Sequence, residues 1–438
     1  MLHSTWWRHG AWNMLEHGVT RAADSLATLL ILFLLDTPDF ARLALAQAIV
    51  APLLFLSVTP ESALYRHYAA WRAEGAQSFE VRLRHYRRFA WAKGPGAVAV
   101  SALVAPFLPN GQGWSSFFAL VWAFGLVLTP QVAGPDREFL RLSLRLRALN
   151  AVNVAQKLTL LGGTAAATLL WPGDLGRLAL VPVLSAVLTA MLARREALRA
   201  LRDPSFAASA PADPRWGSRE AGGTALRFWP FIRDSLRNFS IWNHLQWIAT
   251  NWVQTMDIFF LGIFALGARD LGLYSAALKL ANLSVAAPMA LSNLFSVWLG
   301  RETDENPARG RSLTLRLTSR LAAAIAAQGV VLWLIGPWLV SLFSRGRWSP
   351  AEIEGTVVWF RWMLIGYGIY GATGLLQAWL LLRTSARDFC LRVFVVWAAA
   401  ALVIYATTAA LWKTEGTAPA NVLVALLLIP LLLARLRR

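Results

Sequence analysis

Residues 321–344 read LAAAIAAQGVVLWLIGPWLVSLFS, a run of 24 residues with no aspartate, glutamate, lysine or arginine. A helix needs roughly 20 apolar residues to cross the roughly 30 Å hydrocarbon core of a bilayer, so this stretch predicts a membrane-spanning helix. Four more charge-free runs of similar length occur at 280–300, 362–382, 393–412 and 416–434. The chain is therefore expected to be an all-α polytopic membrane protein.

The overall composition supports this class. The 438 residues are 57% hydrophobic and 15% charged, with a mean hydropathy of +0.48. Soluble globular chains carry roughly 25% charged residues. Cys390 is the single cysteine, which excludes an intramolecular disulfide and a cysteine-based metal site. Residues 1–17 have no apolar core or small-residue cleavage site, so we expect an interfacial helix rather than a signal peptide.

The apolar segments predict about twelve transmembrane helices. They are placed at 16–36, 42–63, 89–108, 114–134, 150–171, 175–193, 240–265, 272–299, 318–343, 355–382, 390–412 and 417–434. Of the 42 lysines and arginines, 32 lie in the termini and in the loops after even-numbered spans, and six lie in the loops after odd-numbered spans. Since positive loops stay on the cytoplasmic side, both termini are predicted to be cytoplasmic.

The basic clusters explain the net charge of +18 without nucleic acid. They flank the ends of the predicted helices, where anionic lipid headgroups attract lysine and arginine. Membrane lipids are therefore expected partners, and nucleic acid is not.

The longest loop divides the chain nearly in half. We predict an N-lobe at 1–193, made of the interfacial helix and six spans, a basic cytoplasmic linker at 194–239, and a C-lobe of six spans at 240–438. The linker ends in an alternation of apolar and basic residues that suits a helix on the membrane surface. A weak internal echo relates the segment starting at Asp39 to the one starting at Asp270.

The seventh predicted span and its sequel carry a recognisable motif. The chain reads Asp257-Ile-Phe-Phe-Leu-Gly262 and then Asp270-Leu-Gly-Leu-Tyr-Ser-Ala-Ala-Leu-Lys279. This resembles the second-half signature of bacterial polysaccharide flippases (Wzx-like), which belong to the multidrug/oligosaccharidyl-lipid/polysaccharide (MOP) exporter superfamily. Phe228-Trp-Pro230 and Ser62-Ala-Leu-Tyr-Arg66 are also similar to that family. The first half departs from it, because Asp36-Thr-Pro-Asp39 stands where the family usually carries a glycine-rich motif.

The resemblance implies two six-helix lobes around a central cavity and alternating access without ATP hydrolysis; no Walker-type phosphate loop occurs. It implies a transporter, not an enzyme, that flips an anionic polyprenyl-(pyro)phosphate-linked oligosaccharide from the cytoplasmic to the periplasmic leaflet of the bacterial inner membrane. Such a protein acts in O-antigen or other lipopolysaccharide and surface-polysaccharide biosynthesis. It needs no cofactor and no metal, and a glycan polymerase or another assembly protein is an expected partner.

Six ionisable residues fall inside the predicted spans. The four cations Arg21, Lys157, Lys279 and Arg361 are the predicted contacts for the diphosphate of the substrate, and the two carboxylates Asp24 and Asp257 are predicted to couple an ion or to act as structural partners. A charge at mid-bilayer costs about 2.5–3.5 kcal/mol on insertion scales, so these side chains should face protein or a hydrated cavity.

Simpler roles remain open for the same residues. Asp24 lies three residues from Arg21 and can neutralise it, while Asp257 and Lys279 lie at similar depth and can form an ion pair. Lys157 and Arg361 are close enough to helix ends to reach the interface.

Two other functions remain open as well. One is a MATE-like exporter of small molecules, in which carboxylates should dominate the cavity. The other is a polytopic glycosyltransferase or glycan ligase that uses Asp36 and Asp39 in the first outer loop.

Overall fold

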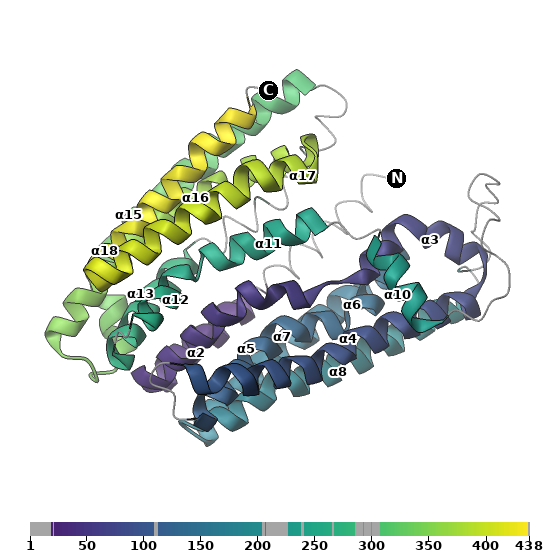
Figure 1. The fold of residues 1–438 in the computed structure, drawn as a ribbon, viewed down its shortest axis with the longest axis horizontal. Helices are drawn as coiled ribbons and strands as arrows, with labels where there is room; N and C mark the ends of the chain where they lie inside the picture. Colours follow the sequence, from purple (N-terminus) through teal and green to yellow (C-terminus); the bar gives the residue numbers. More distant parts are fainter. Residues whose placement is uncertain are drawn as a thin grey trace. The chain divides into compact units, whose positions relative to one another are not determined.

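The computed structural model describes residues 19–20, 22–108, 113–203, 206, 227–237, 241–264, 267–284, 292, 299 and 307–436. These residues are helical nearly throughout and contain no strand, which confirms the all-α prediction. They fold as two compact units (Figure 1). Unit 1 takes its residues from Met1–Ala27, Leu56–Pro106 and Phe117–Ser240, and unit 2 takes them from Thr28–Phe55, Phe107–Ser116 and Ile241–Arg438.

The described helices of unit 1, except α5 (Gly113–Val132), share an aromatic core. They are α3 (Leu64–Ala73), α4 (Ala76–Val104), α5 (Gly113–Val132, in this unit from Phe117), α6 (Gly134–Leu142), α7 (Leu146–Leu170), α8 (Leu175–Arg202) and α10 (Phe228–Arg237). Phe79, Tyr86 and Phe139 are fully buried in this core. Phe231 and Ile232 of α10 join it. The apolar face of the linker helix, predicted to lie on the membrane, thus packs on protein.

A further described helix, Ala22–Leu34, is divided between the two units, and the others belong to unit 2. They are α2 (Thr37–Val50), α11 (Ile241–Val253), α12 (Met256–Ile263), α13 (Ala268–Leu283), α15 (Pro307–Ser344), α16 (Pro350–Arg383), α17 (Ala386–Phe389) and α18 (Val395–Leu436). A π-helical segment, Cys390–Phe394, joins α17 to α18. Helix α16 packs against α13, α15 and α18, and α2 packs along α12 and α13.

The predicted second and seventh spans are not continuous α-helices. After α2, two 3₁₀ segments, Pro52–Ser57 and Pro60–Ala63, replace the rest of the predicted span 42–63. Proline cannot donate the backbone hydrogen bond that a continuing helix needs, which accounts for this break. The seventh span breaks at Thr255, which has φ −132° and ψ 1°.

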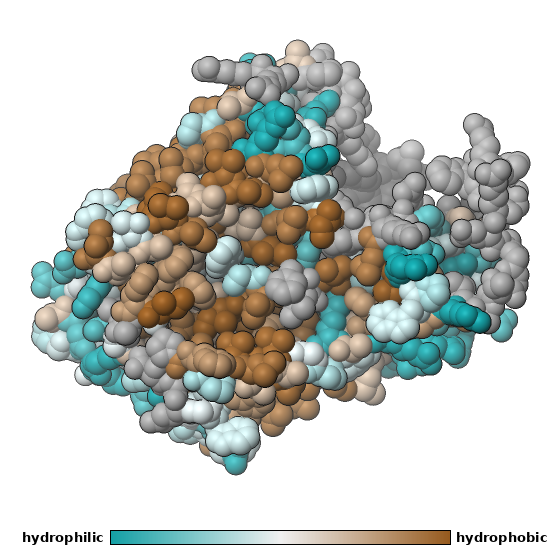
Figure 2. All heavy atoms as spheres, in the orientation of Figure 1, coloured by the Kyte–Doolittle hydropathy of each residue, from teal (hydrophilic) through white to brown (hydrophobic). Residues whose placement is uncertain are grey.

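Several helices have the length and surface of membrane spans. Five described helices are long and apolar enough to cross a bilayer. On α8, Leu180, Leu184 and Met191 are 56%, 63% and 65% exposed. Figure 2 shows apolar side chains covering the region where Figure 1 draws α15, α16 and α18. Apolar stripes of this kind suit contact with lipid rather than water.

Candidate functional site

In unit 1, the structure pairs two of the predicted charges with each other. Lys157 of α7 donates to Asp24 with an Nζ–Oδ1 distance of 2.7 Å. The two residues are 133 positions apart in the chain, and the lysine side chain is 25% exposed. This ion pair offsets the positive charge of Lys157 within the protein. Arg21, the predicted neighbour of Asp24, lies outside the described residues.

In unit 2, Lys279 is held by a neutral group. Its ammonium donates to the Oε1 atom of Gln47, at 2.6 Å, so α13 is tied here to α2. Among the described residues, no carboxylate lies within ion-pair distance of Lys279. The lysine therefore has a neutral hydrogen-bond partner, and the buried carboxylate of Asp257 acts on its charge only through space.

Arg361 of α16 also has no carboxylate bonded to it in the described part of the chain. Its guanidinium lies over the ring of Trp333, 5.0 Å from the centroid. An aromatic face attracts a cation through its quadrupole but adds no negative charge. The Nε atom of Arg361 is buried and has no hydrogen-bond partner among the described residues. One donor of this arginine is thus unsatisfied, which is costly for a buried polar group.

Asp257 is the buried carboxylate of unit 2, with 1% of its surface exposed. It lies in the first turn of α12, just after the break at Thr255, where the positive end of a helix dipole favours an anion. Its Oδ1 atom accepts from the backbone N–H of Ile258 at 2.8 Å. Its Oδ2 atom accepts from the hydroxyl of Tyr274 at 3.0 Å and from the amide of Asn421 at 3.3 Å.

The partners of Asp257 are all neutral. The expected ion pair with Lys279 does not form among the described residues, because each charge has its own neutral hydrogen-bond partners. Asn421 is held in turn by the hydroxyl of Tyr405, which donates to its Oδ1 atom at 2.9 Å. Asp257 therefore has no cation bonded to it among the described residues, and the charge of Lys279 reaches it only through space.

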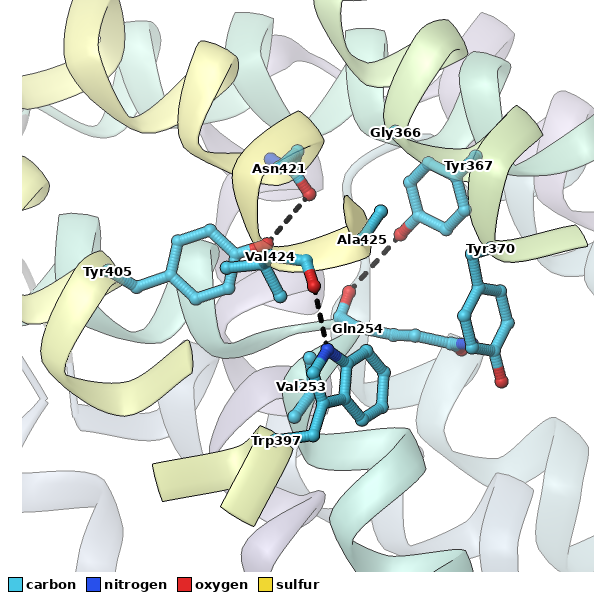
Figure 3. Close-up of a pocket in the computed structure, with 10 residues that line it drawn as sticks. All are labelled: Val253, Gln254, Gly366, Tyr367, Tyr370, Trp397, Tyr405, Asn421, Val424 and Ala425. Atoms are coloured by element: carbon cyan, nitrogen blue, oxygen red, sulfur yellow. Dashed lines mark hydrogen bonds between the residues drawn. The ribbon is translucent and has the colours of Figure 1, made fainter. Parts of the chain in front are cut away.

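A small cavity of about 30 Å³ adjoins this carboxylate network (Figure 3). It is lined by Val253, Gln254, Gly366, Tyr367, Tyr370, Trp397, Tyr405, Asn421, Val424 and Ala425. The hydroxyl of Tyr367 donates to the carbonyl of Gln254 at 3.3 Å, which places a tyrosine on the broken end of α11. A water molecule needs about 10–15 Å³ of such space, so the cavity has room for a water or a monovalent ion.

Three partners of Asp257 and Lys279 were not singled out from the sequence. Tyr274 lies inside the motif that resembles the polysaccharide flippases, but the sequence alone assigned it no role of its own. Gln47 and Asn421 are single amides in apolar segments, and a lone amide in a predicted span is the signal that marks each of them. The tertiary fold alone brings Asn421 to Asp257, 164 positions away.

Comparison with known proteins places the chain in a structural class. Residues 244–388, which contain Asp257, Lys279 and Arg361, match the family model MatE. None of the curated proteins matches the chain. Solved structures match over nearly its whole length, and the identities are low enough that the likeness concerns the fold.

Three of these solved structures show which kinds of transporter share the fold. The lipid II flippase MurJ, in an inward closed conformation, has a TM-score of 0.65 and 9% identity over 97% of this chain and 87% of its own. An outward-facing multidrug resistance MATE family transporter of the MOP superfamily has a TM-score of 0.63 and 14% identity over 98% and 95%. A MOP superfamily transporter from Pyrococcus furiosus, described as having a binding pocket of reverse polarity, has a TM-score of 0.57 and 14% identity over 98% and 96%. The chain has the fold of MOP superfamily transporters.

Proposed function

We propose that the chain is a Wzx-like flippase. It moves an anionic polyprenyl-(pyro)phosphate-linked oligosaccharide from the cytoplasmic to the periplasmic leaflet of a bacterial inner membrane, by alternating access at a central cavity. The observation that carries this proposal is a pair of cations in unit 2 to which no carboxylate is bonded among the described residues: Lys279 is bound to an amide and Arg361 lies over a ring.

The cost of these cations favours an anionic substrate. A positive charge at the bilayer centre costs about 2.5–3.5 kcal/mol, and in the described part of the chain no carboxylate forms an ion pair with either residue to offset it. A diphosphate supplies the missing negative charge and accepts several hydrogen bonds from lysine and arginine. In the Pyrococcus furiosus transporter, reverse polarity of the pocket is described as suggesting a different function. Pocket charge is thus a reasonable guide to substrate on this fold.

Lys157 of unit 1 and Arg21 remain proposed contacts for the same substrate. Lys157 is paired with Asp24, so in this proposal the diphosphate replaces that carboxylate as its partner. Arg21 supplies a further positive charge three residues before Asp24.

The membrane potential favours export of such a substrate. Moving one negative charge out of an inside-negative cell releases about 2.3 kcal/mol per 100 mV. A diphosphate therefore moves outward down the potential without ATP.

We assign ion coupling to Asp257. Its carboxylate is buried beside a broken helix, is held only by neutral donors, and adjoins a cavity of about 30 Å³. Discontinuous helices in transporters leave backbone groups free to bind ions. A proton or a sodium ion that neutralises Asp257 would therefore couple to the conformation of α11 and α12.

Asp257→Asn tests this coupling because it removes the charge and keeps the shape. We expect the variant to lose at least about 10-fold of the stimulation of flipping by a proton or sodium gradient, since 10-fold corresponds to about 1.4 kcal/mol of ion binding. Flipping driven by the potential alone should persist. The measurement is flipping in proteoliposomes with each gradient imposed separately. Asp174→Asn, at the exposed N-cap of α8, is the control, and equal gradient stimulation in both variants would refute the assignment.

One observation favours a MATE-like exporter of cations instead. The cavity of unit 2 combines aromatic rings with the nearby carboxylate of Asp257, and both attract cations. This alternative predicts that the substrate reaches Asp257, whereas the flippase predicts that it reaches Lys279 and Arg361.

Transport of two probes by the purified full-length protein separates these functions. We expect proteoliposomes to flip a fluorescent short-chain polyprenyl-diphosphate glycan and to leave a cationic dye such as ethidium untransported. Flipping is read from the fraction of glycan accessible to an external glycosidase. Dye export without glycan flipping would establish the exporter. Hydrolysis or transfer of the glycan by the protein itself, with no glycosidase added, would establish an enzyme.

A further inference from the structure

Two short segments of unit 2 meet at one end of its helices. The first, which we call the outer turn, comprises residues 33–37 and connects the first predicted span to α2. The second, the clamp loop, comprises residues 345–348 and connects α15 to α16. Both belong to the loops with few positive charges, which the distribution of lysine and arginine places on the periplasmic side.

Arg347 binds the outer turn at three atoms. Its Nη1 atom donates to the carbonyl of Leu35 at 3.0 Å and to the Oδ1 atom of Asp36 at 3.1 Å. Its Nη2 atom donates to the carbonyl of Phe33 at 3.2 Å. These carbonyls lie at the end of a helix, where they have no partner within the helix, so the arginine satisfies them from another element.

The other two long side chains of the clamp loop make the same contact. Arg345 donates to the carbonyl of Phe33 at 3.2 Å and lies over its ring, 4.7 Å from the centroid. Trp348 donates from its Nε1 atom to the hydroxyl of Thr37 at 3.0 Å. Three of the four residues of the clamp loop, Arg345, Arg347 and Trp348, therefore donate hydrogen bonds to the five-residue outer turn.

Beyond the outer turn, α2 packs closely against α12 and α13. A Cβ atom on Gly272 of α13 would overlap the carbonyl of Thr37, and one on Gly262 of α12 would lie 2.5 Å from Leu45. Deeper still, Lys279 donates to Gln47. The outer turn thus sits directly above the lysine that we assign to the substrate.

The bonds at the outer turn are of a kind that water can replace. The side chains of Asp36 and Arg347 are 79% and 29% exposed, and three of the four bonds from the two arginines end on backbone carbonyls. The bond from Trp348 to Thr37 is buried. At the two glycines the backbones of α12 and α13 approach α2 closely, and the side chain of Leu45 fills the space that a Cβ atom on Gly262 would take. The exposed arginine bonds at the end of these helices can separate and re-form without exposing apolar surface.

We propose that the clamp loop is a latch that closes the periplasmic exit by holding the outer turn, and that it releases the turn once per transport cycle. This inference rests on the proposed function, because a latch matters only to a transporter. Arg345 and Arg347 are its donors, and the tie between Trp348 and Thr37 fixes its position.

A reversible cross-link tests the latch. In a Cys390→Ala background, Asp36→Cys and Arg347→Cys place two accessible thiols across it. We expect joining them with a short bis-methanethiosulfonate reagent to reduce glycan flipping in proteoliposomes at least 10-fold, and a reductant to restore it. The matched control, Asp388→Cys with Arg435→Cys, replaces an ion pair within 386–436 of the same unit and should flip normally when cross-linked. Full flipping by the cross-linked latch would overturn the proposal.

A second readout needs no substrate. Gln47→Cys, in the same cysteine-free background, reports access from outside to a membrane-impermeant maleimide. We expect the added pair Arg345→Ala and Arg347→Ala to increase its labelling rate at least 5-fold, and the cross-linked latch to suppress it. An unchanged labelling rate in both cases would reject the latch even if the protein flips glycans. If the labelling rate changes as expected but the protein flips no glycan, the latch is supported and the proposed glycan substrate is rejected.

Discussion

Lys279→Ala and Arg361→Ala should each lower glycan flipping by about 10- to 100-fold, and the double variant should abolish it. Hydrogen bonds to charged groups contribute about 1.5–3 kcal/mol, and each alanine removes one cationic donor to the diphosphate. Neither change leaves a carboxylate unpaired among the described residues, since Lys279 is bound to Gln47 and Arg361 lies over Trp333. A loss of flipping at normal protein level would therefore reflect loss of substrate contact.

The measurement is surface glycan in complemented cells, with flipping in proteoliposomes as the direct readout. Arg320→Ala removes an exposed arginine from α15 and is the matched control, for which flipping should stay within 2-fold of the parent. Lys279→Arg and Arg361→Lys keep the charge and should retain most of the activity. Normal flipping by the double alanine variant would remove the main support for an anionic substrate.

The sequence predicted the membrane helices well because hydrophobicity acts locally. The charge-free run at 321–344 and the loops around it placed α15 and α16, and the structure begins α16 at Pro350 and ends it at Arg383, against a prediction of 355–382. The turn expected between the last two spans coincides with Lys413, which has a φ of +49° within α18. Helix length and turn chemistry are encoded in neighbouring residues.

The break of the seventh span had no such local signal. Residues 241–261 contain neither proline nor glycine, so the pattern predicts one continuous helix, whereas the structure interrupts it at Thr255. The tyrosine that donates to the carbonyl of Gln254 is Tyr367, which lies 113 positions further along the chain. The partners of Asp24 and Asp257 are equally remote. Six charges could be picked out from sequence, but their partners depend on tertiary packing.

Arg87→Ala should have the largest effect on stability. Arg87 of α4 donates to Asp136 of α6 through its Nε and Nη2 atoms, and through Nη1 to Glu80 at 2.8 Å. Asp136 is 1% exposed, so removal of the arginine leaves a carboxylate buried without its cation. Breaking a buried pair in this way costs about 3–5 kcal/mol, a large part of the roughly 5–15 kcal/mol that stabilises a folded domain.

The free energy of unfolding in detergent, measured by denaturant titration, tests this expectation. Arg88→Ala removes the exposed neighbour on the same helix and should change the free energy by less than about 0.5 kcal/mol, as surface substitutions usually do. Arg87→Met with Asp136→Leu and Glu80→Gln removes the arginine and the charges of both its partners, and should recover most of the stability, because the cost arises from unpaired carboxylates and not from the missing contacts. If Arg87→Ala unfolds like Arg88→Ala, then the pair does not hold α4 to α6, and the core of unit 1 must rest on its aromatic residues alone.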